Sequence, residues 1–173
     1  VIATYNRPQR LAKCLSALAQ QQAINFTWEV LVINDGGAAL NLQPFEKTLN
    51  LRLHAQDNAG PGSARNQGVK LAQGEFILFT DDDCEPHPHW VSEMTAALHT
   101  GKLVAGKTIN KLKQFAGSEA SQVLLDYLMQ ALKNTPEYFF TSNNLGIAKK
   151  DFLAIGGFDP DFYTSAGEDR EFT

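Results

Sequence analysis

Cysteine, long apolar runs and blocks of basic residues are all scarce in this sequence, and each absence excludes a class of protein. Only Cys14 and Cys84 are cysteines, too few and too far apart to hold a fold together with disulfides, so we expect reduced thiols in a cytoplasmic protein. No apolar run approaches the roughly 18 residues of a membrane-spanning helix, and no secretion signal opens the chain. The formal net charge is −4, without a cluster of Lys or Arg, which argues against nucleic-acid binding.

The two ends of the chain lack features of a complete protein. Val1 enters a strand pattern without a starting Met, and Thr173 follows a charged cluster with no closing element. We therefore expect a single domain, residues 1–173, truncated at both ends from a longer protein. Its apolar content of 43% is enough to bury one core. An anchor or a partner domain could lie in the missing parts, and any association with the inner face of a membrane would come through them.

Short apolar runs alternate with helical spacings along residues 1–106. The runs predict buried strands at residues 1–3, 30–33, 51–54, 76–79 and 103–105. Helical spacing predicts helices at residues 8–18, 64–74 and 90–98, with Asn6 a candidate cap for the first. Residues 40–49, which contain Pro44, form an ambiguous weak helix. Strand and helix in alternation, with short turns, favour a mostly parallel sheet covered by helices on both faces, an α/β/α sandwich.

The pattern changes after Gly106. A longer helix is expected over residues 118–134, an extended segment over 141–148 and a short helix over 151–155. The chain ends in a charged patch that contains Glu168 and Asp169 after a glycine-rich loop. These two acids suit either the N-terminus of a helix or the role of a general base, and spacing alone leaves both interpretations open.

Three consecutive carboxylates close the strand predicted at residues 76–79. Asp81, Asp82 and Asp83 come directly after the apolar run, and Pro86 prevents the strand from continuing. Three negative charges at the mouth of a buried strand repel one another, and a bound cation would offset that repulsion. Carboxylates suit Mg²⁺ or Mn²⁺, and Mg²⁺ commonly binds through one or two carboxylates together with substrate phosphates. The alternative interpretation is a solvated acidic turn.

Asp35 and Arg65 each follow one of the other predicted strands, those at residues 30–33 and 51–54. Because parallel strands bring their carboxyl ends to one edge of the sheet, Asp35 is expected near the three aspartates. There it could accept a hydrogen bond from a nucleotide base or ribose, whereas the alternative is an ordinary Asp-Gly turn. Arg65 falls in the first turn of a helix, where the dipole favours anions. A nearby carboxylate or phosphate is therefore expected, unless the side chain simply lies on the surface.

Three further motifs do not hold up on inspection of their spacing. The GPGSAR segment resembles a phosphate-binding glycine loop, but it lacks the third glycine of the dinucleotide fingerprint and follows the third strand. The HPH segment has no supporting cluster of His or Cys, so its histidines are interpreted as loop residues. The DDDCEP segment begins like a calcium loop but has proline where that loop needs glycine.

Six segments, taken in order, give the chain a resemblance to a known family. They are VIATYNRP, EVLVINDGG, NAGPGSARNQG, GEFILFTDDDCEP, NNLGIAKKDFLAIGGFDPDF and GEDREF. With them the chain resembles the catalytic domain of the family 2 glycosyltransferases, which are nucleotide-diphospho-sugar transferases with a GT-A (Rossmann-like) fold. The resemblance covers essentially all 173 residues. It implies a nucleotide-binding half at about residues 1–106 and an acceptor half at about residues 107–173.

The resemblance also implies roles in a donor site. The positions that match nucleotide-binding residues of the family are Thr4, Tyr5, Asn6, Asp35, Arg65 and Asp81. Among them, Asp35 matches the acid that reads the base, usually uracil. Asp81 and Asp83 match the Asp-x-Asp pair, in which the second acid binds Mn²⁺ or Mg²⁺ directly and the first approaches the ribose or a metal-bound water. Asp82 is the variable middle residue of that pair.

On the acceptor side, the resemblance implies Asp169 as the base that deprotonates the acceptor hydroxyl, Glu168 as an acceptor contact and Trp90 as a lining residue. The implied reaction is metal-dependent, inverting transfer of a sugar from a nucleotide-diphosphate donor, foremost a UDP-sugar. The acceptor would be a glycan, a lipid-linked molecule or a protein, in polysaccharide or cell-envelope glycan synthesis. The alternatives are a non-catalytic sugar-nucleotide binding module of a larger enzyme and a sugar-phosphate nucleotidylyltransferase.

Overall fold

The computed structural model describes residues 1–135, 139–161 and 172. Its elements are β1 (Ile2–Thr4), α1 (Pro8–Leu18), β2 (Val30–Asp35), the 3₁₀ turn η1 (Gln43–Phe45), β3 (Leu51–Gln56), α2 (Pro61–Leu71), β4 (Phe76–Thr80), α3 (Trp90–Leu98), β5 (Leu103–Ala105), α4 (Ala116–Leu132), β6 (Asn144–Ala148) and α5 (Lys149–Ala154). The predicted strands and helices are present, with ends moved by a few residues. The weak helix expected at residues 40–49 is wrong. Only η1 forms there, and the segment turns into β3 at Leu51.

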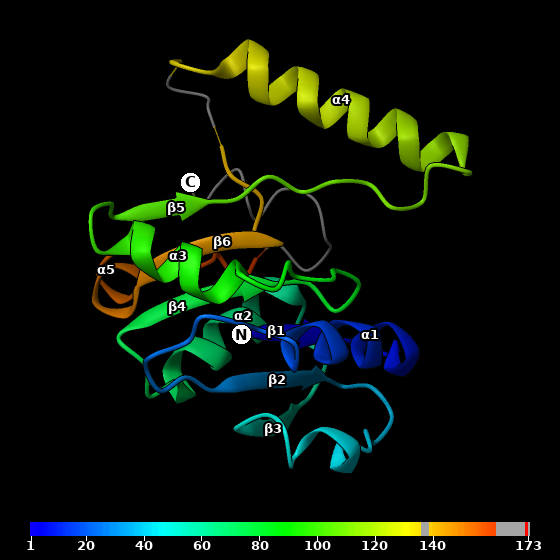
Figure 1. The fold of residues 1–173 in the computed structure, drawn as a ribbon, viewed down its shortest axis with the longest axis vertical. Helices are drawn as coiled ribbons and strands as arrows, with labels where there is room; N and C mark the ends of the chain where they lie inside the picture. The colour runs from blue at the N-terminus through cyan, green and yellow to red at the C-terminus, as the bar shows by residue number, and fades with distance from the viewer. Residues whose placement is uncertain (136–138, 162–171, 173) are drawn as a thin grey trace.

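The strands form two three-stranded sheets, one of β1, β2 and β3 and one of β4, β6 and β5, which lie edge to edge. β1, β2 and β3 run parallel, with Ile2 opposite Val32, and β6 lies antiparallel between β4 and β5. Two bonds connect these halves: the Val1 amino group donates to the Leu78 carbonyl (2.8 Å), and the Thr80 amide donates to the Val1 carbonyl (3.3 Å). The strand order is therefore β3–β2–β1–β4–β6–β5 (Figure 1). The mostly parallel sheet is confirmed, with β6 as the reversed strand.

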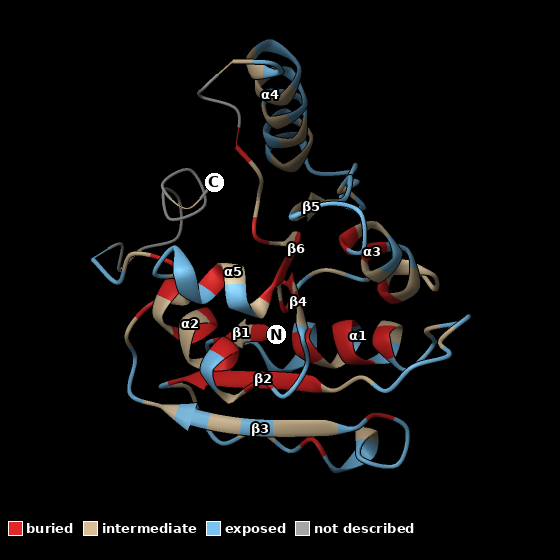
Figure 2. Ribbon diagram, turned by 90° about the vertical axis from the view of Figure 1, so that its left-hand side faces the viewer, coloured by how far each residue is buried: buried red, intermediate tan, exposed pale blue. Residues whose placement is uncertain are grey.

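Helices cover both faces of this sheet. Figure 2 shows α2 and α5 on one side and α1 and α3 on the other. All residues of β2 are buried, and they divide by face. Val30 and Val32 pack in the apolar cluster beneath α1, whereas Leu31 packs in the cluster that α2 and α5 cover. Because successive side chains of a strand point to opposite faces, a continuous apolar run serves both layers, and the expected three-layer sandwich is confirmed.

The last part of the described chain differs from the sheet-forming part. Helix α4 lies beyond β5, apart from the sheet (Figure 1), and none of its residues is buried. None of the helices in the described ranges combines the length and apolar character needed to cross a bilayer. Cys14 and Cys84 are free thiols, as expected, and burial raises the pKa of Cys14 to about 12.

One half-buried carboxylate, that of Glu29, connects elements at the end of the sheet where β2 begins. The Glu29 side chain, which is 13% exposed, accepts hydrogen bonds from Nη1 of Arg52 (2.9 Å) and from the Gln73 amide (2.6 Å). Arg52 also donates to the Leu71 carbonyl (3.1 Å), so the start of β2, β3 and the end of α2 are tied together. Burial acts to raise the pKa of Glu29, but these donors outweigh it and hold the pKa below its usual value of 4.5.

We expect Glu29→Gln to lower the free energy of unfolding at pH 7 by about 1–2 kcal/mol, at the low end for charged hydrogen bonds because Arg52 is partly exposed to solvent. Since the folded pKa lies below the unfolded value of 4.5, the stabilisation is present above pH 4.5 and is lost as the pH falls through the folded pKa. Urea unfolding between pH 7 and pH 3 measures this loss. Glu46→Gln, at an exposed acid, is the matched control. A difference between wild type and Glu29→Gln that stays constant with pH would contradict this role.

Candidate functional site

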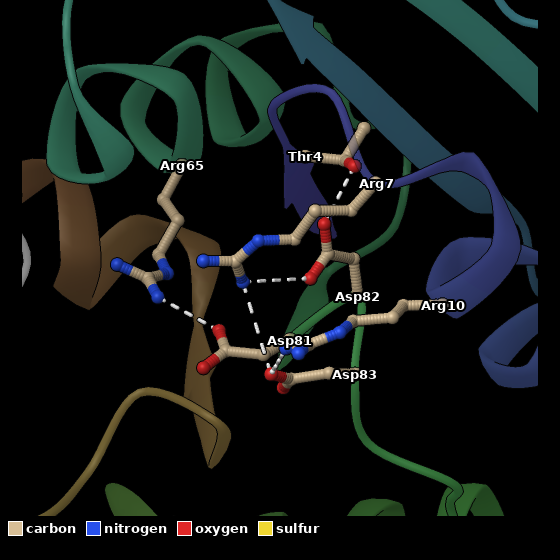
Figure 3. Close-up of polar contacts among 7 residues, drawn as sticks. All are labelled: Thr4, Arg7, Arg10, Arg65, Asp81, Asp82 and Asp83. Carbon is tan, nitrogen blue, oxygen red and sulfur yellow. Dashed lines mark hydrogen bonds and ion pairs between the residues drawn. The ribbon is translucent and has the colours of Figure 1, made fainter.

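The carboxyl ends of β1, β2 and β4 lie side by side, and the predicted site residues gather there. Thr4 ends β1, Asp35 ends β2, and Asp81 follows directly after β4. Helices α1 and α2 begin at the same edge, so residues from both reach the acidic segment (Figure 3). The expected convergence of these strand ends is present in the described residues.

Asp82 is the most deeply buried of the three consecutive aspartates, with a side chain 3% exposed. Its Oδ2 accepts a hydrogen bond from the Thr4 hydroxyl (2.6 Å), and its Oδ1 lies 3.3 Å from Nη1 of Arg7. Burial raises the pKa of Asp82, while the hydroxyl and the guanidinium oppose that rise. Asp82, which the family resemblance gave as the variable middle residue of the Asp-x-Asp pair, therefore connects the end of β4 to the end of β1.

Asp81 and Asp83 flank this buried residue and remain partly exposed, at 34% and 40%. Nη2 of Arg65 lies 2.8 Å from Oδ1 of Asp81, which supplies the carboxylate expected near that arginine. The Arg65 side chain is 6% exposed, and its guanidinium carbon lies 5.6 Å from the centre of the Phe158 ring. Arg65 is thus a buried, anchored cation and not a surface residue.

Two arginines at the start of α1 also reach the acidic segment, and sequence reasoning did not identify either. Nη1 of Arg10 lies 2.9 Å from Oδ2 of Asp83, and Nη1 of Arg7 lies 3.7 Å from the same oxygen. The argument applied to Arg65 would have found them, because α1 has no acid in its first turn to offset its positive end. Three carboxylates therefore face three guanidinium groups (Figure 3).

Asp35 is buried, and its carboxylate organises the loop before α2. Oδ1 accepts hydrogen bonds from Nε2 of Gln56 (2.8 Å) and from the Ala59 amide (2.9 Å), and Oδ2 accepts one from the Gly60 amide (2.9 Å). Gly60 has a φ of +88°, a conformation that glycine adopts without steric cost. The glycine loop is therefore held by the acid at the end of β2.

The remaining predicted residues lie around this edge. Tyr5 is half exposed, and Asn6 is not the cap of α1, because Arg7 occupies that position. Asn6 instead has a φ of +55°, and its side-chain oxygen accepts a hydrogen bond from the Ala38 amide (3.0 Å). The change of role follows from this left-handed backbone, which turns the side chain towards the loop after β2.

Trp90 begins α3 and lies near the same edge, next to β6. Its indole N–H donates to Oδ1 of Asn144 (2.8 Å), and Asn144 lies opposite Thr80, the last residue of β4. The indole is therefore close to the acidic segment, while its role on an acceptor side stays a prediction. Glu168 and Asp169 lie outside the described residues.

The donor set of this edge fits a divalent cation. Asp81 and Asp83 offer hard carboxylate oxygens that solvent can reach. Within the described residues no group of three or more His, Cys, Asp or Glu side chains could enclose a metal ion. Mg²⁺ is usually held by one or two carboxylates, with water and phosphate completing its shell, and Mn²⁺ shares this preference for oxygen ligands. The two aspartates are thus sufficient for such an ion only together with a phosphate ligand.

Comparison with known proteins agrees with this geometry. The sequence profile described as Glycosyl transferase family 2 matches residues 1–155. Chondroitin synthase from Escherichia coli is 29% identical in an alignment that covers 99% of this chain and 31% of that protein. The chain therefore spans about a third of the length of this relative.

Solved structures share the fold. TarS from S. aureus, residues 1–349 in complex with UDP-GlcNAc, has a TM-score of 0.71 at 23% identity, covering 99% of this chain and 50% of that one. The mannosyltransferase PcManGT from Pyrobaculum calidifontis, in complex with GDP-Man and Mn²⁺, has a TM-score of 0.72 at 20% identity, covering 98% and 48%. At these identities the likeness establishes the GT-A fold that the sequence predicted.

We expect Asp35→Asn to destabilise the protein by about 1–3 kcal/mol, because an amide has one acceptor oxygen and would leave a buried backbone N–H of the glycine loop without a partner. Urea unfolding measures the free energy, and hydrogen exchange at the Gly60 amide reports the local effect. Asp57→Asn, an exposed acid in the same loop, is the matched control. Equal stability of the two variants would show that the carboxylate of Asp35 does not hold the loop.

Proposed function

The chain belongs to glycosyl transferase family 2, and on that basis we propose that it is a catalytic domain that transfers a sugar from a nucleotide-diphosphate donor to a hydroxyl acceptor. The observation that carries the proposal is the convergence of Asp81, Asp83 and Arg65 at the carboxyl edge of the sheet. Ligands of open α/β sheets bind at this edge. All three residues lie within the part of the chain that the family profile matches.

The donor is proposed to be a UDP-sugar, bound across the ends of β1, β2 and β4. Tyr5, half exposed beside β1, would contact the base. Asp35 already accepts three N–H groups, and it would bind the edge of the base through the one acceptor position that these leave. Arg65 would contact the phosphates, and its charge, its contact with Phe158 and its position at the start of α2 support this role. Among the structural neighbours, TarS was solved with UDP-GlcNAc, which supports a donor of this class.

Asp83, with Asp81 beside it, would hold Mn²⁺ or Mg²⁺. The cation would supply positive charge where the diphosphate leaves, which lowers the cost of breaking the bond to the sugar. PcManGT, a neighbour with the same fold, was solved with Mn²⁺, and this supports the choice of metal. In this arrangement Asp81 keeps its contact with Arg65, so one guanidinium stays beside the phosphates throughout.

Asp169 is proposed to remove the proton from the acceptor hydroxyl, with Glu168 and Trp90 on the acceptor side. A carboxylate with an ordinary pKa is already ionised at neutral pH, so the role requires correct placement and no raised pKa. Attack on the face opposite the diphosphate would invert the anomeric carbon. The acceptor is proposed to be a glycan, a lipid-linked molecule or a protein, and the location the cytoplasm, including the inner face of the membrane.

We expect Asp83→Ala to weaken the binding of UDP in the presence of Mn²⁺ by about tenfold or more, equivalent to about 1.4 kcal/mol, and to cause no such weakening in EDTA. Titration calorimetry with UDP under both conditions measures the difference. Glu85→Ala removes an exposed acid two positions along, whose partner is Lys111, and serves as the control. Unchanged UDP affinity with Mn²⁺ in Asp83→Ala would exclude this residue as the metal ligand.

We expect Asp169→Asn to bind UDP and Mn²⁺ as the wild type does but to lose transfer by about 10²–10⁴-fold, the usual contribution of a general base. Release of UDP from UDP-sugars, measured with the full-length protein, reports turnover, and Asp161→Asn at an exposed acid is the control. Normal transfer by Asp169→Asn would remove it as the base. Donor binding by the wild type without any turnover would favour the non-catalytic binding module.

A further inference from the structure

Arg10 and Asp83 form an ion pair between α1 and the acidic segment, in which Nη1 lies 2.9 Å from Oδ2 (Figure 3). Both side chains are open to solvent, at 57% and 40% exposed. Asp83 is the one acidic partner of Arg10 within the described part of the chain. The same carboxylate is the candidate ligand of a divalent cation, so Arg10 occupies an oxygen that the cation would need.

The position of Arg10 in its own helix is unfavourable without that partner. Arg10 lies in the first turn of α1, which begins at Pro8 and contains no acid in that turn. The positive end of a helix dipole repels a cation placed there. Its contact with Asp83 compensates for this repulsion. The start of α1 therefore places a positive charge next to the acidic segment.

The three arginines at this edge are not equivalent. Arg65 is buried against Phe158. Arg7 is 53% exposed and lies 3.7 Å from Asp83, but its shorter contact, 3.3 Å, is with the buried Asp82, which ties it to the scaffold. Arg10 contacts an exposed carboxylate, and exposed ion pairs contribute little to stability. Arg10 is consequently the guanidinium that can leave its partner at the smallest cost in free energy.

The net charge at this edge sets a second constraint on ligand binding. Three aspartates and three arginines cancel formally, so a divalent cation bound alone would leave an excess of two positive charges. A diphosphate bound with the cation would restore the balance. A guanidinium released from Asp83 would be available at that moment to donate charge-assisted hydrogen bonds to phosphate oxygens.

We propose that the guanidinium of Arg10 occupies the place of the divalent cation at Asp83 and is displaced when the cation binds. In the metal-free protein it neutralises Asp83, it gives up that oxygen when the carboxylate becomes a metal ligand, and it then turns to the phosphates of the donor. Arg10 thereby lowers the affinity for the cation alone and raises the coupling between cation and diphosphate. This inference rests on the proposed function.

The test compares Arg10→Gln with Lys13→Gln, which removes the same charge one turn further along α1, from an exposed position outside the ion pairs of the described residues. Binding of Mn²⁺, measured by electron paramagnetic resonance of the free ion, is followed with and without UDP. Without UDP, we expect Arg10→Gln to bind Mn²⁺ about two- to fivefold more tightly than the wild type, the size of effect of an exposed ion pair. The factor by which UDP tightens Mn²⁺ binding should be smaller in Arg10→Gln, and Lys13→Gln should match the wild type in both measurements.

A second measurement involves neither turnover nor nucleotide. In EDTA, Arg10→Gln should have a lower melting temperature than Lys13→Gln, and Arg10→Lys should recover part of the loss. Saturating Mn²⁺ should remove the difference, since the cation then neutralises Asp83 in both variants. Equal Mn²⁺ affinity in Arg10→Gln and Lys13→Gln, while the wild type binds Mn²⁺ and UDP normally, would overturn the inference and leave the proposed function intact. A wild-type protein that binds neither Mn²⁺ nor UDP would overturn both.

Discussion

Repulsion among three adjacent aspartates at the end of a buried strand is the constraint on which this edge of the protein depends. The chain meets it with guanidinium groups from elements outside β4: Arg7 and Arg10 from the start of α1, and Arg65 from α2. Because each partner belongs to another element, the ion pairs also position both helices against β4. Electrostatic compensation and the placement of the helices are therefore the same set of contacts.

The three aspartates have different roles because they differ in burial. The three residues form a turn closed by a hydrogen bond from the Cys84 amide to the Asp81 carbonyl (3.1 Å), in which Asp82 is buried against Thr4 while Asp81 and Asp83 stay partly exposed. The inner carboxylate is committed to the scaffold, and the outer two keep oxygens that solvent can reach. Asp35 repeats this division, since its carboxylate holds the Gly60 loop from which α2 and Arg65 start. Rigid placement of an outer group by inner hydrogen bonds is what a binding site requires.

Sequence patterns predicted most of the fold because its elements are local and strongly apolar. The fully buried strand β2 follows from short-range spacing, and the helix after Pro8 follows from spacing and from proline at the first helical position. The same proline signal starts α2 at Pro61, three residues before the predicted start. The parts that were missed depend on contacts between distant residues. The bond from Thr4 to Asp82 spans 78 positions, and no local pattern distinguishes it from a variable middle residue. Asn6 fails as a cap for the same reason, because its partner is Ala38.

The arrangement of charge explains why a neutral edge can still select a charged ligand. A lone cation at Asp83 would have to compete with Arg10, and a lone diphosphate would gain the contact with Arg10 only as that guanidinium leaves its carboxylate. Each ligand therefore meets a cost that the other removes, because the cation frees a guanidinium and the diphosphate absorbs the excess charge. By linkage the two affinities must rise together. Coupling of this kind would make the site respond to the metal–diphosphate pair, the charged portion of a nucleotide-sugar donor, more strongly than to either component.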